Sequence, residues 1–284
     1  MAGHSQRKRM KKCIWIFGIS ICLLLFFFWQ NNALVTSRYV FETDKIGEDL
    51  DGYRIVQISD LHNKRFGKNQ KRLLEKIKVC NPDLIVVTGD LVDSNHTDME
   101  KAMEFIRGAV LMAPVYYVTG NHEKWLGEDT EAALLELLEQ EGVNCLNNGK
   151  EEIRVKQDSF FLFGLDDSNL VDNTLQQLIS DDRKDLSAEE KFTVLLAHEP
   201  QNLLSYSNAK MDLVLAGHAH GGQVRLPWIG GIVAPDQGFF PEYTEGLYEA
   251  NDTSMIVSRG LGNSIIPVRI LNRPEIVCVE LGKK

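Results

Sequence analysis

The sequence has no closely spaced pair of cysteines, which limits what its five cysteines can do. Cys13 and Cys22 fall in an apolar segment, and Cys80, Cys145 and Cys278 are far apart. Structural zinc sites use clustered cysteines, and a disulfide framework needs an even number of them. The pattern therefore disfavours both, and it leaves open a single bridge such as Cys80 with Cys145.

Acidic residues are missing from the first twelve positions, which hold five basic ones. The whole chain has a net charge of −9, so residues 13–284 carry −9 minus 5, or −14. A body this acidic has little affinity for the phosphate backbone of nucleic acids. Nucleic acid is therefore not an expected partner.

Residues 13–29 contain no charged side chain, and a few more apolar residues follow them. This length is near the lower limit for a membrane-spanning helix, and the basic flank predicts that the amino terminus stays in the cytoplasm. The segment does not end in the small-x-small pattern of a signal-peptidase site, which favours an uncleaved anchor over a removed signal peptide. We therefore predict a basic cytoplasmic tail (1–12), a transmembrane signal anchor (13–35), a tether (36–52) and a domain (53–284) outside the cell membrane.

Strand-like and helix-like segments alternate from residue 53 onward, without internal repeats or low-complexity stretches. Helical patterns cover residues 68–79, 98–109 and 130–141, and the second half is richer in strands, with one more helix expected over 173–180. This alternation predicts a layered α/β domain, with two sheets covered by helices.

Five short segments carry metal-binding side chains, and each follows an apolar run. They are Asp60-Leu61-His62, Gly89-Asp90, Gly120-Asn121-His122-Glu123, His198 and Gly217-His218-Ala219-His220. Because ligands of open α/β sheets bind beyond the carboxyl ends of the strands, these segments are expected to converge. Each has an ordinary explanation when taken singly, such as a turn aspartate or a core histidine. Together they hold five of the seven histidines, and they predict a metal site.

Two of these segments have an i, i+2 spacing of ligand side chains. In an extended chain, residues i and i+2 point to the same side. Asp60 and His62 are therefore expected to reach one cation together, and His218 and His220 are expected to do the same with two imidazoles.

The other segments offer different chemistry. A carboxylate such as Asp90 can bridge two cations with its two oxygens. Asn121 can lend a neutral oxygen to a metal. His122 can be a ligand or a general acid, and Glu123 can orient it.

This ordered set of motifs resembles the calcineurin-like metallophosphoesterase family over about residues 53–281. The continuation of the last motif as Gly-His-Ala-His-Gly-Gly-Gln, together with the apolar amino terminus, resembles its membrane-anchored YkuE/YaeI-like subgroup. The resemblance implies an α/β sandwich with two central mixed sheets flanked by helices. It also implies two divalent cations, one held by Asp60, His62, Asp90 and His220 and the other by Asp90, Asn121, His198 and His218.

The resemblance further implies hydrolysis of a phosphoester by a metal-bound hydroxide. Asp90 would bridge the two cations, and His122 would protonate the leaving oxygen or steady the phosphoryl charge. Mixed nitrogen and oxygen ligands suit Mn, Zn, Fe or Co better than Mg or Ca. The sequence does not distinguish among the first four, and it gives no oligomeric state.

Residues 224–248, which follow the last motif, form an apolar loop. We hypothesise that this loop contacts lipid, and the alternative is that it packs as core. Some relatives hydrolyse nucleotide-linked acylated sugar precursors, so the expected substrate is a phosphodiester or pyrophosphate of a membrane or envelope lipid. A phosphomonoesterase of broad specificity and a non-catalytic binding module are the alternatives. No position of the motif set is substituted, which disfavours the latter.

Overall fold

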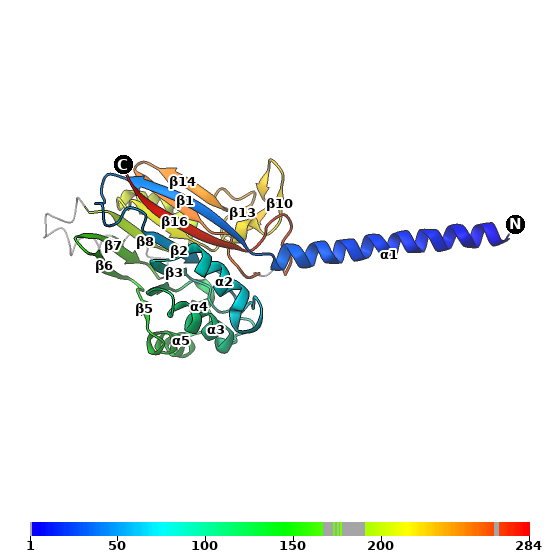
Figure 1. Cartoon of the computed structure of the whole chain (residues 1–284), viewed down its shortest axis with the longest axis horizontal. Helices are drawn as coiled ribbons and strands as arrows, with labels where there is room; N and C mark the ends of the chain where they lie inside the picture. The colour runs from blue at the N-terminus through cyan, green and yellow to red at the C-terminus, as the bar shows by residue number, and fades with distance from the viewer. Residues whose placement is uncertain (1, 167–172, 174, 176, 178–190, 264–266) are drawn as a thin grey trace.

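Two six-stranded mixed sheets form the centre of the domain (Figure 1). The computed structural model describes residues 2–284 except 167–172, 174, 176, 178–190 and 264–266. The first sheet has the order β1 (Val35–Thr43), β16 (Glu275–Lys283), β2 (Arg54–Ile58), β3 (Leu84–Thr88), β4 (Val115–Val118), β5 (Val143–Cys145). The second has the order β14 (Gly246–Ala250), β15 (Thr253–Val257), β9 (Leu213–Ala216), β8 (Thr193–Leu196), β7 (Asp158–Gly164), β6 (Gly149–Val155).

The two sheets pack face to face and share one buried apolar layer. That layer includes Ile55 and Val86 from the first sheet and Leu162, Val194 and Leu215 from the second. Parallel strands that are buried on both faces are apolar throughout, and all five residues of β3 are buried. This explains why the apolar runs before the polar motifs were recognisable as strands.

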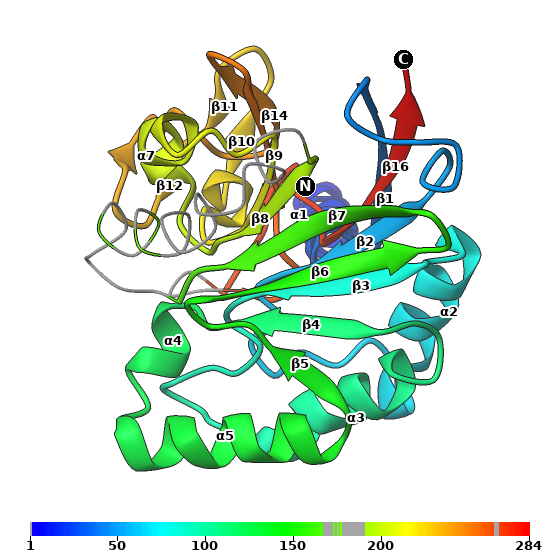
Figure 2. The same ribbon diagram turned by 90° about the vertical axis from the view of Figure 1, so that its left-hand side faces the viewer.

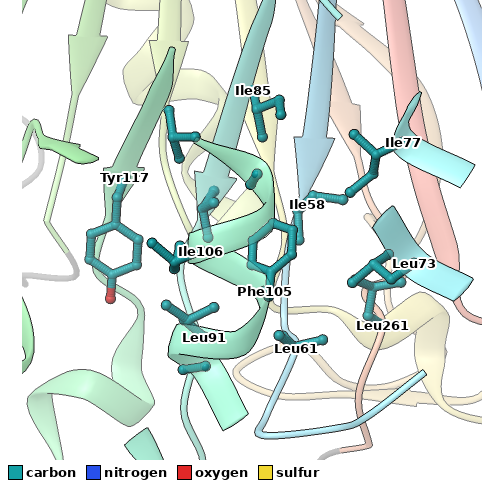
Figure 3. Close-up of a cluster of buried hydrophobic side chains, with 14 of the residues drawn as sticks. Ile58, Leu61, Leu73, Ile77, Ile85, Leu91, Phe105, Ile106, Tyr117 and Leu261 are labelled. Carbon is teal, nitrogen blue, oxygen red and sulfur yellow. The ribbon is translucent and has the colours of Figure 1, made fainter. Parts of the chain in front are cut away.

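Helices cover the outer faces of both sheets (Figure 2). The α-helices of the domain in the described part of the chain are α2 (Lys71–Cys80), α3 (Met99–Ala109), α4 (Asn121–Lys124), α5 (Glu128–Gln140) and α7 (Leu203–Asn208), and α1 (Ala2–Asn32) precedes the domain. Phe105 and Ile106 of α3 lie beside Ile58 and Ile85 of the first sheet (Figure 3). Helix α7 packs on the second sheet through Leu203. The predicted α/β sandwich with two mixed sheets is therefore confirmed.

The expected tether over residues 36–52 is wrong in its first part. Residues Val35–Thr43 form strand β1, which pairs in parallel with β16 at the edge of the first sheet. Alternate side chains of β1 face the core, where Tyr39 and Phe41 pack against the inter-sheet cluster. The domain thus begins before residue 53, because this edge strand completes the sheet.

Helix α1 also differs from its expected limits. It begins inside the segment assigned to the basic tail and ends at Asn32, and Leu34 is already buried in the domain core. Residues Arg9–Asn32 are long and apolar enough to cross a membrane, and most of that stretch is not covered by the described part of the domain. The helix extends away from the sandwich (Figure 1).

Three further expectations concern the helix over 173–180, the loop 224–248 and the cysteines. The helix expected over 173–180 lies largely outside the described residues. The loop 224–248 contains two small hairpins, β10 (Arg225–Leu226) with β11 (Gly230–Gly231) and β12 (Val233–Ala234) with β13 (Gly238–Phe239), before β14 begins. All five cysteines are free, so the bridge between Cys80 and Cys145 is not formed.

Candidate metal centre

The five polar segments converge where β2, β3, β4, β8 and β9 end. Their candidate ligands are all buried, with exposed fractions of 8% or less (Asp60, His62, Asp90, Asn121, His198, His218 and His220). The predicted convergence follows from the parallel pairing of β2 with β3, β3 with β4 and β8 with β9. Parallel neighbours end at the same sheet edge, so the residues after them meet.

Four side chains form a first group. Ligand atoms of Asp60, His62, Asp90 and His220 all lie within 4.8 Å of one another. His62 Nε2 lies 3.2 Å from His220 Nε2 and 3.3 Å from Asp90 Oδ2. No hydrogen-bond partner among the described residues lies near Asp60 Oδ2 or His62 Nδ1. A buried carboxylate oxygen without a donor is costly, and a cation would satisfy it.

A second group brings together acceptor atoms that would otherwise repel one another. Asn121 Oδ1 lies 3.0 Å from His198 Nε2 and 3.0 Å from His218 Nδ1, and those two nitrogens are 3.1 Å apart. The opposite nitrogen of each imidazole faces an oxygen acceptor: His198 Nδ1 is 2.8 Å from the Thr88 carbonyl oxygen, and His218 Nε2 is 2.7 Å from Asp236 Oδ2.

In the neutral form of each of these imidazoles the proton therefore belongs on the outer nitrogen, from which it can be donated to an oxygen. Two nitrogen lone pairs and one amide oxygen then point at one another inside the protein. A shared divalent cation is the natural partner for such a set of donors, so the second group fits a metal ion.

Asp90 lies between the two groups. Its Oδ2 is 3.3 Å from His62 Nε2 in the first group and 3.4 Å from His198 Nε2 in the second. Its Oδ1 accepts a hydrogen bond of 2.9 Å from the backbone N–H of His122, which fixes the carboxylate. This position suits a bridging ligand.

The backbone of the candidate ligands departs from the extended geometry expected for the i, i+2 pairs. Five of them have a positive φ, namely Asp60, His62, Asp90, His218 and His220. In the two i, i+2 segments this has opposite consequences. Asp60 and His62 still join one group, whereas His218 and His220 belong to different groups, as the family resemblance implies; the expectation from the i, i+2 spacing alone, that both reach one cation, is wrong.

Glycines permit this crowding. Gly89 has φ of 81°, and a Cβ on it would lie 2.5 Å from His198 Nδ1. At Gly217 a Cβ would lie 2.7 Å from Asp60 Oδ2. The glycine that precedes each of these motifs is therefore required by close approach of the neighbouring segment.

His122 stands beside the first group without joining either group. Its ring centroid lies 4.4 Å from that of His62 and 4.9 Å from that of Trp125. The backbone N–H of Ser94 donates to His122 Nδ1 at 3.1 Å. A neutral His122 consequently carries its proton on Nε2, and it can donate that proton.

Glu123 has a different task from the one expected. Its carboxylate accepts hydrogen bonds from the backbone N–H groups of Asp90, Val92 and Gly120, at 2.8, 3.1 and 2.8 Å. It thus joins the loops after β3 and β4, and Ser94 rather than Glu123 contacts His122. Burial, and then the charge of Asp90, raises the pKa of Glu123 to about 8.

The protonation states of the first group suit metal binding. Burial lowers the pKa of His62, and burial with the neighbouring His62 and Arg269 lowers the pKa of His220 well below its usual range. Burial opposes ionisation of Asp90, but His198 and the other nearby histidines hold its pKa well below the ordinary value. Neutral imidazoles and an ionised carboxylate are the forms that coordinate cations.

Two functional candidates were missed in the sequence. Asp236 lies in the turn between β12 and β13 and bonds His218. Arg269 is fully buried, donates to the backbone oxygen of Arg259 at 2.8 Å, and places Nη2 3.4 Å from His220 Nδ1. Asp236 follows only the two-residue strand β12, and neither residue stands in one of the motifs, so nothing in their local sequence indicated them.

This arrangement can be compared with known proteins. A family model described as calcineurin-like phosphoesterase matches residues 53–222, which is more than half of the chain. The chain therefore belongs to the calcineurin-like phosphoesterase family. Family membership makes it a metal-dependent phosphoester hydrolase, and the two groups described above are a site that can hold two metal ions.

Particular relatives support this membership. The chain is 31% identical over 261 residues to YkuE of Bacillus subtilis, an uncharacterized metallophosphoesterase, covering 89% of this chain and 87% of that protein. It is also 31% identical over 249 residues to a transmembrane protein with metallophosphoesterase domain of Danio rerio, covering 84% and 55%. The NAD nucleotidase (NadN) structure of Haemophilus influenzae shares the fold, with a TM-score of 0.50, 15% identity and coverage of 74% and 45%.

Proposed function

We propose that this chain hydrolyses a phosphodiester or pyrophosphate bond of a membrane or envelope lipid at a dinuclear metal centre. One cation (Mn, Zn, Fe or Co) is held by Asp60, His62, Asp90 and His220, and the other by Asp90, Asn121, His198 and His218. The observation that carries this assignment is the place of Asp90 Oδ2, within 3.4 Å of a histidine nitrogen from each group. When bound, two such cations activate water and neutralise charge on the phosphoryl oxygens.

The residues of the chain supply the remaining steps. Asp90 would be the ligand shared by the two cations, and its carboxylate is held in place by the backbone N–H of His122. His122 is the proposed general acid: Ser94 keeps the proton of the neutral ring on Nε2, from which it passes to the leaving oxygen. Asp236 and Thr88 hold the rings of His218 and His198 through their outer nitrogens.

A lipid substrate is favoured by the attachment of the domain to α1. We propose that α1 crosses the cell membrane with its basic end in the cytoplasm, which leaves the catalytic domain outside. A domain held at a bilayer encounters membrane-bound substrates at high effective concentration. A phosphomonoesterase of broad specificity is the competing reaction.

The assignment of the metal ligands is tested with three variants of the full chain. Asp90→Asn is expected to lose bound metal in elemental analysis and to abolish hydrolysis of bis-p-nitrophenyl phosphate. His122→Ala is expected to keep both metals and to lose activity by about 10²-fold or more. His96→Ala, at an exposed histidine that belongs to neither group, is the matched control and should behave as the wild type. Loss of metal from His122→Ala would refute its role as a non-ligand acid.

The substrate is tested with a panel presented to the wild-type chain in lipid bilayers. Turnover is compared for lipid phosphodiesters, lipid pyrophosphates and soluble phosphomonoesters. The proposal expects kcat/KM to be highest for one of the two lipid classes. Higher kcat/KM for the soluble monoesters would favour the broad phosphomonoesterase and overturn the lipid assignment.

A further inference from the structure

The last turn of α1 is bonded to the domain rather than connected by a flexible segment. Lys64 Nζ donates to the Asn31 carbonyl oxygen at 2.6 Å, and Arg72 Nη2 donates to that of Asn32 at 2.8 Å. The guanidinium of Arg273 lies 4.9 Å from the centre of the Trp29 ring. These contacts fix the direction in which the helix leaves the domain.

Two residues, Arg269 and Asn272, connect the same turn to the candidate metal ligand His220. The backbone N–H of Arg269 donates to Asn31 Oδ1 at 3.1 Å, and Arg269 Nη2 lies 3.4 Å from His220 Nδ1. In addition, the backbone N–H of Asn272 donates to Gln30 Oε1 at 3.3 Å, and Asn272 Nδ2 donates to the His220 carbonyl oxygen at 2.7 Å. The metal centre therefore lies close to the end of the helix.

An exposed apolar surface lies on the two hairpins β10–β11 and β12–β13. We call it the apolar lip; it consists of Leu226, Trp228, Ile229, Phe239 and Phe240. The exposed fractions are 103% for Trp228, 78% for Phe239 and 69% for Phe240. The alternative that these side chains pack as core is therefore wrong for the lip, although Ala234 and Tyr243 do pack on the second sheet.

The lip lies beside the end of α1 at the side of the domain from which the helix departs, as the labels β10, β13 and α1 show (Figure 1). The contacts agree with this view. The backbone N–H of Arg225 donates to the Ile270 carbonyl oxygen at 2.9 Å, and Asn272 Nδ2 donates to that of Gln223 at 3.0 Å. One short segment, residues 269–273, thus holds both the base of the first hairpin and the end of the helix.

We propose that the apolar lip is a second membrane contact, which inserts into the interface of the same bilayer that α1 crosses. The inference rests on the membrane anchoring in the proposed function. Tryptophan and phenylalanine are favoured at the membrane interface, and Trp in particular is enriched there. With the helix and the lip both held by residues 269–273, the domain has two points of contact and a fixed orientation on the lipid surface.

This orientation bears on the chemistry because the lip is connected to the metal centre. Asp236 lies in the turn between β12 and β13, three residues before Phe239, and its carboxylate bonds His218 Nε2 at 2.7 Å. The hairpin that contacts lipid therefore also holds a candidate ligand. A phosphoester at headgroup depth would meet the centre without leaving the bilayer.

The proposal is tested by quenching of tryptophan fluorescence in the full chain. The protein is placed in nanodiscs of phosphatidylethanolamine and phosphatidylglycerol, with and without bromine on the acyl chains. The emission removed by Trp228→Phe is compared with that removed by Trp125→Phe, a matched exposed tryptophan next to α4. We expect bromine to quench the Trp228 component about twofold or more and to leave the Trp125 component unchanged.

Three outcomes separate this inference from the proposed function. Equal quenching of the Trp228 and Trp125 emission by brominated lipid overturns the lip as a membrane contact. If Trp228 is shielded from solvent only when a disc holds more than one chain, the lip binds a second copy of the protein. This result also overturns the lip as a membrane contact. Trp29, at the end of α1, reports on anchoring: if its emission is not quenched, the anchoring itself is wrong. None of these readings requires metal or turnover.

A kinetic readout completes the test. The triple variant Trp228→Ser, Phe239→Ser, Phe240→Ser should lower turnover of a bilayer-embedded phosphodiester about tenfold. It should leave turnover of bis-p-nitrophenyl phosphate unchanged, as should Leu111→Ser, a control at an exposed leucine between α3 and β4. An equal loss on both substrates would place the lip in the active site and refute a separate role in membrane contact.

Discussion

Replacement of Asp236 tests whether a residue outside every motif sets the affinity of the second metal site. Its carboxylate bonds His218 Nε2 at 2.7 Å, which keeps Nδ1 of that ring available for the cation. Removing such an outer partner of a metal-binding histidine typically costs 10- to 100-fold in affinity, or about 1.4 to 2.7 kcal/mol. The Asp236 side chain is 62% exposed, so solvent screening places the expected loss for Asp236→Ala near the lower limit, about tenfold.

The assay is competition between the full chain and a chelator of known affinity, followed for each of the two bound cations. Asp236→Asn should lose less than Asp236→Ala, because the amide oxygen still accepts the N–H of His218. Asp252→Asn, at an exposed aspartate in the turn between β14 and β15, is the control. An unchanged affinity in Asp236→Ala, or an equal loss at both cations, would refute the role assigned to this bond.

Three further predictions address stability. Removing the cations with a chelator should lower the melting temperature in calorimetry by about 5 °C or more, and adding Mn should restore it. The reason is that a ligand at 100 times its Kd stabilises the folded state by about 2.7 kcal/mol. An unchanged melting temperature would argue against bound metal. Gly217→Ala should lower the free energy of unfolding, measured in urea, by about 2 kcal/mol, because its Cβ would meet Ser59 Oγ and Asp60 Oδ2. Gly142→Ser is the comparison: the space around Gly142 is open but its φ is +87, so this substitution should lower stability only through backbone strain. Bonding to Lys191, and to Ser159 and Arg154, lowers the pKa of Glu152 from 4.5 to about 2. The stabilisation from Glu152 is therefore complete above pH 4.5 and is lost as the pH falls toward 2, so Glu152→Gln should cost up to about 1 kcal/mol at neutral pH and nothing near pH 2.

Most of the fold could be predicted because its central strands are apolar on both faces. The apolar runs 84–88 and 213–216 form β3 and β9, and every residue in them is buried. The polar residues after such strands must lie at the sheet edge, so their convergence needed no knowledge of the loops. Amphipathic α2 was predictable for a similar reason: Leu73 and Ile77 are buried, and Asn81 ends the helix in a left-handed conformation.

The elements that could not be predicted from the sequence depend on partners far away in the chain. Strand β1 has a mixed pattern and becomes a strand because β16, more than 200 residues later, offers its edge. Asp236 and Arg269 meet His218 and His220 only after the hairpins and the segment 269–273 fold back over the site. No local pattern of residues predicts such long-range contacts.

The separation of His218 and His220 shows why motif spacing alone could not assign the ligands. Extended geometry would send both rings to one cation, but His218 has φ of 65° and His220 has φ of 47°. A left-handed conformation costs an ordinary residue roughly 1 to 2 kcal/mol, and it persists at functional sites when the surrounding contacts enforce it. Here the His218 backbone N–H donates to Asp60 Oδ1 at 3.0 Å, which turns the chain so that one imidazole enters each group. The carboxylate of one motif thus sets the direction of the histidines in another, and this coupling matters because the loop that carries His218 and His220 contributes one ligand to each group.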